Sequence, residues 1–431
     1  LTDGFFEKVD YIGAFGTTDW TAGWSNFTPK TTTYAAPTMT KGNGDFTIAG
    51  GLNITANETW SGTIKLDGWV YVNDGVTLTI QPGTVIRGTA KSALVIRKGA
   101  KIMAEGTKDN PIVFTSMNDP GARNTSDWAG LIICGKGINN LAGGEGDVEG
   151  MTGEKHGGTD NADNSGSLKY VRLEFCGYDV SGGQGKEINT LTFYSVGSGT
   201  TVDYVQASYG GDDAFEFFGG AVNCKHLISF SGEDDDFDTD NGYVGKVQFG
   251  VVLRDATVYD TDPCRAFESD NDSKATAATP FTSPIFSNIS CFGPVSDDNM
   301  TTNFQKHDAG MYLRRNTKIR IWNSLFDGFV KGLIIDGVST FDNAKADGLQ
   351  VKYCMLAGIK NANAVDTAGM TANKTYSTSD VRTWFNNNSN EVLTSVWDVW
   401  VTDPFNLSSP NFLPENDDTN NKLSNLRNKS C

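Results

Sequence analysis

The chain has 431 residues, of which 38% are hydrophobic and 11% aromatic, enough apolar surface to build a continuous folded core. Its formal net charge of −17 disfavours nucleic acid and anionic lipid as partners, because both require a basic face. No apolar run reaches the length of a membrane span and no basic, apolar leader is present, so we expect an extracellular or cell-surface protein whose export signal has been removed.

The first 45 residues hold an aromatic segment followed by a link that contains Thr and Pro. A free tail could not leave this much aromatic surface in water, so we expect residues 1–45 to form an arm that packs against another copy of the chain. The residues expected to mediate this self-association are Phe5, Phe6, Tyr11, Phe15, Trp20 and Trp24.

From about Phe46, short β-branched runs recur between turns rich in Gly, Asn and Asp, which is typical of strands rather than helices. We predict strands at residues 69–72, 76–80, 84–86, 93–96, 112–115, 170–173, 202–205, 226–230 and 247–252. A sandwich, a propeller and a β-helix are all built from many strands of this kind. Residues 139–166 are rich in Gly, Asp and Glu and are expected to form a long excursion, as are two further polar loops at residues 261–282 and 293–310.

An internal repeat decides between these folds. Residues 211–220 align without gaps with residues 233–242, which begin 22 positions later, and both carry the pattern Asp-Asp-x-Phe-(Glu/Asp)-x-x-x-Gly. A propeller blade needs about 40 residues or more, whereas the coils of a β-helix are shorter. We therefore predict an all-β, right-handed parallel β-helix over residues 46–370, followed by a partly helical, less regular cap over residues 371–431 with Ser379 as an N-cap.

Blocks of the chain resemble a known family. Residues 66–116, LDGWVYVNDGVTLTIQPGTVIRGTAKSALVIRKGAKIMAEGTKDNPIVFTS, are followed in order by WAGLIICGK, SGSLKYVRLEF and EINTLTFYSVGSGTTVDYVQ. These blocks resemble exported, surface-associated proteins of Bacteroidetes-type bacteria with a pectate-lyase-like right-handed parallel β-helix. The resemblance implies export, often by a type IX route, and no general activity.

The order of the terminal blocks departs from that resemblance. A block like residues 5–27 is expected at the end of the unit, after one like residues 409–416, yet here it opens the chain. The unit is then circularly permuted, or the arm completes a neighbouring subunit, or block order varies within the family. The second option predicts a head-to-tail contact that propagates into a filament.

The repeat also predicts the candidate site. Stacking of the two copies places Asp212 over Asp234, Asp213 over Asp235 and Glu216 over Asp238, at the ~4.8 Å spacing of neighbouring strands. Two carboxylates at that spacing repel by roughly 3 kcal/mol at an effective dielectric constant of 20. A hard cation such as Ca²⁺ relieves this repulsion, and the alternative is a solvated acidic turn. The residues expected to bind calcium are Asp212, Asp213, Glu216, Asp234, Asp235, Asp238 and Asp240.

Other chemistry has little support. The seven cysteines lack metal-finger spacing; Cys264 and Cys291 could form a disulfide, and the thiols of Cys134, Cys176, Cys224 and Cys354 are expected to be buried. No nucleophile-elbow motif is present, and His226 lies in an apolar strand, where a structural role is expected. A pectate-lyase-like reaction needs a basic residue of lowered pKa, and nothing marks Lys225, Arg254 or Arg265 as one, so we predict no catalytic residue.

The leading hypothesis is a secreted or cell-surface structural protein that associates with copies of itself. The alternative is a calcium-dependent, lyase-like polysaccharide-active enzyme or a carbohydrate-binding module that uses the acidic face. A long groove lined by basic and aromatic residues beside the acidic stack favours the alternative.

Overall fold

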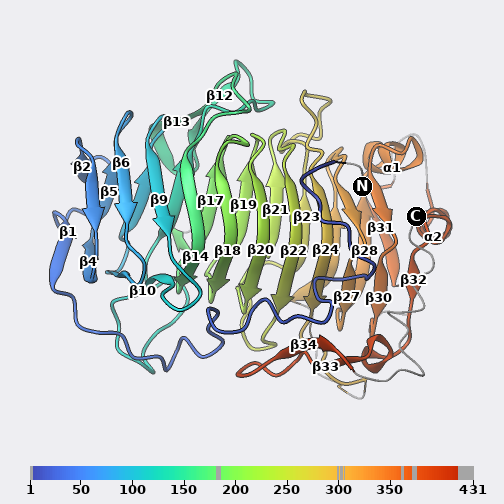
Figure 1. The fold of residues 1–431 in the computed structure, drawn as a ribbon. Coiled ribbons are helices and arrows are strands. Elements are labelled where there is room, and N and C mark those ends of the chain that lie inside the picture. Colours follow the sequence, from blue (N-terminus) through green and yellow to red (C-terminus); the bar gives the residue numbers. More distant parts are fainter. Residues whose placement is uncertain are drawn as a thin grey trace.

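The computed structural model describes residues 3–180, 186–298, 300, 304, 306–360, 364–370 and 376–415. In these residues the regular structure is almost entirely β-strand, wound into coils that stack along one axis (Figure 1). The strands of the two large sheets pair in parallel, so the predicted all-β parallel β-helix is confirmed. No helix in the described part of the chain is long and apolar enough to cross a membrane.

Sheet A, the larger of the two, has 17 strands within the described residues. They are β1 (Met39–Gly42), β3 (Glu58–Trp60), β4 (Thr63–Asp67), β6 (Thr77–Ile80), β7 (Val85–Gly88), β9 (Lys101–Glu105), β10 (Ile112–Ser116), β14 (Gly166–Glu174), β18 (Thr201–Ser208), β20 (Asn223–Phe230), β22 (Lys246–Leu253), β24 (Ile285–Phe292), β26 (Arg320–Trp322), β27 (Leu325–Asp327), β29 (Gln350–Lys352), β30 (Met355–Ala357) and β32 (Glu391–Val392).

Sheet B has 11 strands in the same part of the chain. They are β2 (Leu52–Ile54), β5 (Trp69–Val72), β8 (Ala93–Ile96), β11 (Gly130–Cys134), β17 (Leu191–Tyr194), β19 (Phe215–Phe218), β21 (Phe237–Asp240), β23 (Cys264–Ser269), β25 (His307–Leu313), β28 (Lys331–Asp336) and β31 (Val365–Ala368). The remaining elements are the strand pairs β12 (Glu145–Val148) with β13 (Met151–Gly157), β15 (Tyr178–Asp179) with β16 (Glu187–Ile188) and β33 (Val401–Asp403) with β34 (Asn411–Pro414), the helices α1 (Val338–Lys345) and α2 (Thr378–Asn387), and the 3-10 helix η1 (Val396–Val399).

Each central coil contributes one strand to sheet B and one long, bent strand to sheet A. The bend lies at a single residue with positive φ in each long strand: Tyr170, Tyr204, His226, Phe249 and Asn288, at φ values from 50° to 64°. Left-handed backbone is unfavourable for aromatic residues, so the bends need compensation from packing. The rings of Tyr204 and His226 stack at 4.2 Å and those of Tyr170 and Tyr204 at 4.5 Å. These ring contacts compensate for the unfavourable backbone conformation.

The interior of the coils is filled by side chains that alternate along the strands. Leu, Ile, Val and Phe from successive coils form one core that runs from β2 to α2. Aromatic rings stack along the axis, as Phe193 does on Phe217 at 5.2 Å and Phe215 on Phe237 at 5.7 Å. This stacking is what the repeat predicted, because equivalent residues of adjacent coils share one register.

The predicted strands are all present, and the differences lie at the margins. Sheet A begins at β1 and ends at β32, so the β-helix extends beyond the predicted limits of 46 and 370 at both ends. Helix α2 is capped by Ser377, in a capping box with Asp380, rather than by Ser379. The disulfide considered between Cys264 and Cys291 is absent, because both are free buried thiols within parallel strands. Cys431 and the tail from residue 416 lie outside the described residues.

The N-terminal arm lies along the outer face of sheet A of its own chain, where it runs as a dark-blue trace across the front of Figure 1. Two glutamine side chains hold it in place: Gln206 pairs with both backbone groups of Asn26 at 2.8 Å, and Gln248 pairs with those of Glu7 at 2.7 and 2.9 Å. The backbone N–H of Gly13 donates to the carbonyl of Asn323 at 2.8 Å. The arm therefore belongs to the body of the molecule.

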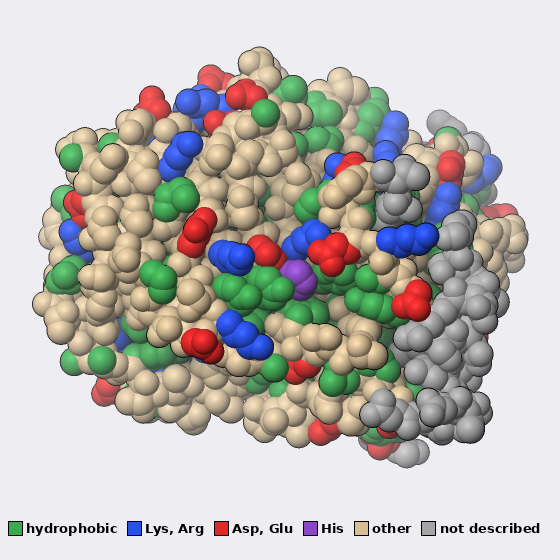
Figure 2. Space-filling view, viewed as in Figure 1, with side chains coloured by type: hydrophobic (Ala, Val, Ile, Leu, Met, Phe, Trp, Pro, Cys, Tyr) green, Lys and Arg blue, Asp and Glu red, His purple; other side chains and the backbone are tan. Residues whose placement is uncertain are grey.

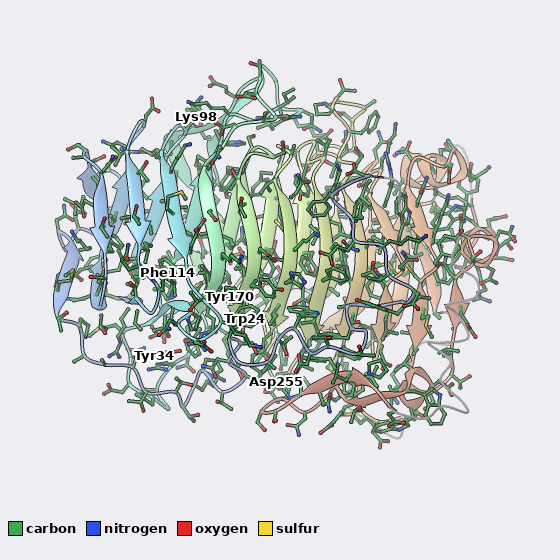
Figure 3. All side chains as sticks on the ribbon, viewed as in Figure 1. Trp24, Tyr34, Lys98, Phe114, Tyr170 and Asp255 are labelled. Atoms are coloured by element: carbon green, nitrogen blue, oxygen red, sulfur yellow. The ribbon has the colours of Figure 1, made fainter. Side chains whose placement is uncertain are left out.

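The aromatic side chains of the arm are covered by that body. Trp24 is 1% exposed and meets Tyr170 and Tyr204 edge-on, and Figure 3 shows Trp24 beside Tyr170. Phe15 is 4% exposed and stacks at 5.2 Å on Phe412 of β34. Phe6 is buried, and Phe5, Tyr11 and Trp20 are partly buried. On the face of the molecule that the arm crosses, hydrophobic side chains lie beside charged side chains of both signs (Figure 2).

The aromatic side chains of the arm are thus buried, as their number predicted, but by the arm's own chain. The aromatic surface that a free tail would leave in water is already packed against the chain's own coils and against β34. The sequence blocks 5–27 and 409–416 nevertheless meet in space, which agrees with a permuted order of neighbouring blocks. The structure contains a single chain, so association with a second copy stays a prediction.

Candidate functional site

The candidate site lies on the outward face of sheet B, where adjacent strands bring acidic residues into register. In β19 and β21, Phe215 pairs with Phe237 and points into the core, so Glu216 and its partner Asp238 point outward. The next strand, β23, places Glu268 beside Asp238. The predicted 22-residue stacking of Glu216 over Asp238 is confirmed, and Glu268 extends the row by one coil.

The turns that precede these strands add a second row of carboxylates. Asp212 and Asp213 come before β19, and Asp234 and Asp235 occupy the equivalent positions before β21. The Oδ1 atom of Asp213 accepts a hydrogen bond from the backbone N–H of Asp235 at 2.9 Å, so the two turns are linked to each other. The predicted pairing of Asp213 with Asp235 is thereby present in the structure.

These residues line a cavity of about 230 Å³, which we call the acidic cavity. Its lining consists of Glu149, Glu187, Asn189, Asp212, Asp213, Glu216, Asp234, Asp235, Asp238, Asp262, Arg265, Glu268 and Arg314. Ten of these thirteen side chains are acidic and two are arginines, a net charge of 2 − 10 = −8 with every group ionised. No thiol or imidazole lies among them, so the donor set consists of oxygens, which hard cations prefer.

Within the cavity the carboxylates form two close sets. One oxygen from each of Asp212, Asp213 and Asp234 lies within 4.8 Å of the others, and the same holds for Asp213, Glu216 and Asp238. Asp213 belongs to both sets. The Oδ1 atoms of Asp234 and Asp238 are shielded from solvent and have no hydrogen-bond partner in the described part of the chain. A buried carboxylate oxygen without a partner is costly unless a proton or a cation compensates it.

Burial is the main cause of the electrostatic perturbation in the cavity. It raises the pKa values of Asp212, Asp213 and Glu216 well above the usual carboxyl range, and the neighbouring carboxylates raise them further. The same two causes raise the pKa of Glu149 to about 6. The pKa of Glu268 is raised to about 8 even though Arg265 and Arg314 contact it, because burial outweighs these ion pairs.

Two predicted calcium ligands differ from the rest. Asp235 lines the cavity, but its Oδ1 accepts a hydrogen bond from the backbone N–H of Arg265 at 2.5 Å and it belongs to neither close set. Asp240 is not among the lining residues, and its Oδ1 accepts from the backbone N–H of Asn241 at 2.5 Å. Asp236, in the same acidic run, points inward and forms a buried ion pair with Arg254 at 2.8 Å.

Several residues that line the acidic cavity were not predicted from the sequence. Glu149 lies in the turn between β12 and β13, so the excursion at residues 139–166 returns a carboxylate to the cavity. Glu187, Asn189 and Asp262 also come from loops or short edge strands, and no pattern marked them. Glu268 had a detectable signal: the dipeptide Phe267-Glu268 repeats Phe215-Glu216 and Phe237-Asp238, after a longer loop.

The basic residues named in the sequence are dispersed. Lys225 lies on sheet A and pairs with Glu7 of the arm at 2.7 Å, and Arg254 is enclosed with Asp236. Only Arg265 of the three reaches the cavity, where Arg314 joins it. Neighbouring carboxylates raise the pKa of both guanidinium groups against the effect of burial, so neither is suited to act as a base. The Nδ1–H of His226 donates to the carboxylate of Asp203 at 2.7 Å, within the aromatic stack, as expected for a structural residue.

A family model described as a pectate-lyase-like beta helix domain matches residues 51–401 of the chain. No curated protein and no solved structure matches it.

Proposed function

The chain belongs to the pectate-lyase-like β-helix family, and from this premise we propose that it is an exported structural β-helix whose acidic cavity binds Ca²⁺. The observation that carries the proposal is the pair of buried, unpartnered carboxylate oxygens on Asp234 and Asp238, two residues that line a cavity together with eight other acidic residues.

A hard divalent cation fits this cavity better than the alternatives. Protonation relieves only part of the repulsion near neutral pH, because a group such as Glu149, with a pKa of about 6, is mostly ionised there. The two arginines offset only two of ten negative charges, and Arg314 is also drawn to Asp270 outside the cavity, at 2.9 Å. Calcium accepts six to eight oxygens in flexible geometry, and carboxylates with water in a cavity of this size supply them.

The cell exterior is the compartment that suits such a site. Extracellular calcium modules work with dissociation constants of about 10⁻⁴–10⁻³ M, because calcium is abundant there. The excess of acidic residues keeps the chain soluble in that medium. The filament-forming role expected from the arm is not part of this proposal, because the arm is packed on its own chain.

Calorimetric titration of the chelator-stripped protein with Ca²⁺ tests the proposal, with the melting temperature measured in parallel. We expect saturable binding and a higher melting temperature in Ca²⁺ than in EDTA. An Asp109→Asn variant, which removes an exposed carboxylate elsewhere, should behave like the wild type. Absence of binding heat together with an unchanged melting temperature would overturn the proposal.

A calcium-dependent polysaccharide-binding or lyase-like role is the second candidate. Arg265 and Arg314 share the cavity with the carboxylates, so an acidic sugar could meet a bound cation and a guanidinium together. The raised pKa values of both arginines argue against a lyase base and leave binding as the better-supported form of this candidate. Release of unsaturated, ultraviolet-absorbing products from pectate or alginate would establish the enzymatic form instead.

A further inference from the structure

We infer that the acidic cavity holds two hard divalent cations that share the Asp213 carboxylate, an inference that rests on the proposed function. The sharing follows from the arrangement of the carboxylates: Asp213 belongs to two close sets whose other members differ.

The first position lies among the turn residues. Oxygens of Asp212, Asp213 and Asp234 lie within 4.8 Å of one another. Three oxygens at such spacing can share one Ca²⁺ ion, whose ligands lie at about 2.3–2.6 Å and are up to twice that distance apart. The Oδ1 of Asp234 is buried and unpartnered, so this set includes a carboxylate with an oxygen that no group in the described part of the chain satisfies.

The second position lies over the strands. Asp213, Glu216 and Asp238 form a set of the same dimensions, and Asp238 supplies its own buried, unpartnered Oδ1. Glu216 is oriented by the side-chain amide of Asn189, which donates to its Oε2. The Oδ1 of the same Asn189 accepts from the backbone N–H of Asp213 at 3.2 Å. One amide therefore positions a residue of the second set and the residue that both sets share.

One ion cannot satisfy both sets. An ion among the turn residues meets the carboxylate of Asp234 but not that of Asp238, which belongs to the other set, and the reverse holds for an ion over the strands. Charge leads to the same conclusion, because five carboxylates carry −5, so one divalent ion leaves −3 and two leave −1. A water molecule occupies about 30 Å³ in the liquid. The cavity of about 230 Å³ therefore has room for both ions and several water molecules.

The two ions should bind in separable steps. Carboxylate-bridged metal pairs lie about 3.5–4 Å apart, so the second ion enters against the repulsion of the first. We therefore expect one tighter and one weaker calcium site in the same cavity.

The test is a Ca²⁺ titration of the full chain by calorimetry, with bound calcium counted by equilibrium dialysis. The wild type should bind two ions. Asp234→Asn replaces a charged ligand by a neutral one in the first set only, and Asp238→Asn does so in the second only, so each variant should bind one ion. Asp213→Asn should weaken both steps, by about tenfold or more each, and the exposed control Asp109→Asn should still bind two.

The outcomes separate this inference from the proposed function. A wild-type stoichiometry of one overturns the shared pair but leaves the calcium-binding function standing, whereas no binding at all overturns both. Equal loss of both ions in Asp234→Asn and Asp238→Asn would also overturn the two-position arrangement. Asn is isosteric with Asp and relieves repulsion, so circular dichroism should show folded variants, and terbium luminescence with Tb³⁺ replacing Ca²⁺ gives a second count.

Discussion

Replacing Asp238 with asparagine should change the stability of the β-helix in opposite directions with and without calcium. In EDTA the carboxylate of Asp238 faces those of Asp213 and Glu216, with oxygens within 4.8 Å. At an effective dielectric constant of 20, each fully ionised pair at this distance costs about 3.5 kcal/mol. Burial raises the pKa values of all three groups, so part of this repulsion is already relieved by protons near neutral pH.

We therefore expect Asp238→Asn to stabilise the cation-free protein by about 1–3 kcal/mol at about pH 8. In saturating Ca²⁺ the sign reverses, because the variant lacks one charged ligand and so loses one ion. Loss of one ion at a Ca²⁺ concentration a thousandfold above its dissociation constant removes about 4.1 kcal/mol of linked stabilisation, which exceeds the gain in the cation-free protein. For a cooperative unit of this length, 1 kcal/mol corresponds to roughly 1 °C in melting temperature, which scanning calorimetry resolves.

The assay compares wild type, Asp238→Asn and Asp109→Asn in EDTA and in Ca²⁺. Asp109 is exposed and lies outside the acidic cavity, so its variant should follow the wild type in both media. A variant at position 238 that is destabilised by the same amount in both media would refute the reasoning, since that result indicates a purely structural carboxylate. A variant more stable than the wild type in both media would refute the cation site as well.

Three further predictions concern the other carboxyls of the cavity, the N-terminal arm and Asp327. The pKa values of Glu149 and Glu268 are raised to about 6 and about 8, so these cavity carboxyls bind protons more tightly in the folded state than in the unfolded state. The melting temperature in EDTA should therefore fall as the pH rises from about 5 to about 8. Bound Ca²⁺ should make the melting temperature depend less on pH. Trp24→Ala should cost about 3–5 kcal/mol of arm docking and expose residues 1–45 to limited proteolysis, whereas Trp397→Ala, at a side chain 54% exposed, should not. Burial raises the pKa of Asp327, whose oxygens have no partner among the described residues, so Asp327→Asn should raise the melting temperature at about pH 8 and leave it unchanged at about pH 4; equal effects at both pH values would contradict this.

The fold could be predicted from the chain alone because a β-helix is built from local rules. Each coil contacts only its neighbours, so a 22-residue offset between two copies of one motif carries directly into strand register. The stacking of Glu216 on Asp238, and the linking of Asp213 to Asp235, follow from that offset. The bends of the sheet A strands could not be predicted, because tyrosine, histidine and phenylalanine, which rarely adopt left-handed backbone, occupy four of the five bend positions.

The composition of the acidic cavity depended on tertiary structure. Glu149 reaches it from a hairpin about 60 residues before Asp212, and its place depends on how that excursion folds back over sheet B. Asp236 lies in the turn just before β21 and pairs with the buried Arg254, whereas Asp238 lies within the strand and lines the cavity, a difference that no sequence pattern marked. Loop geometry and the partner of each charge follow from contacts between distant segments.

The N-terminal arm also shows what the sequence determines and what only the tertiary structure decides. Its aromatic content determined that it must be buried, since that much apolar surface is not stable in water. What buries it was decided by the outer face of sheet A, where Gln206 and Gln248 offer amide pairs to the arm backbone and Phe412 offers a ring to Phe15. Hydrophobic burial carries no direction and selects no partner, whereas hydrogen bonds and ring contacts do both, and these exist only once the coils have stacked.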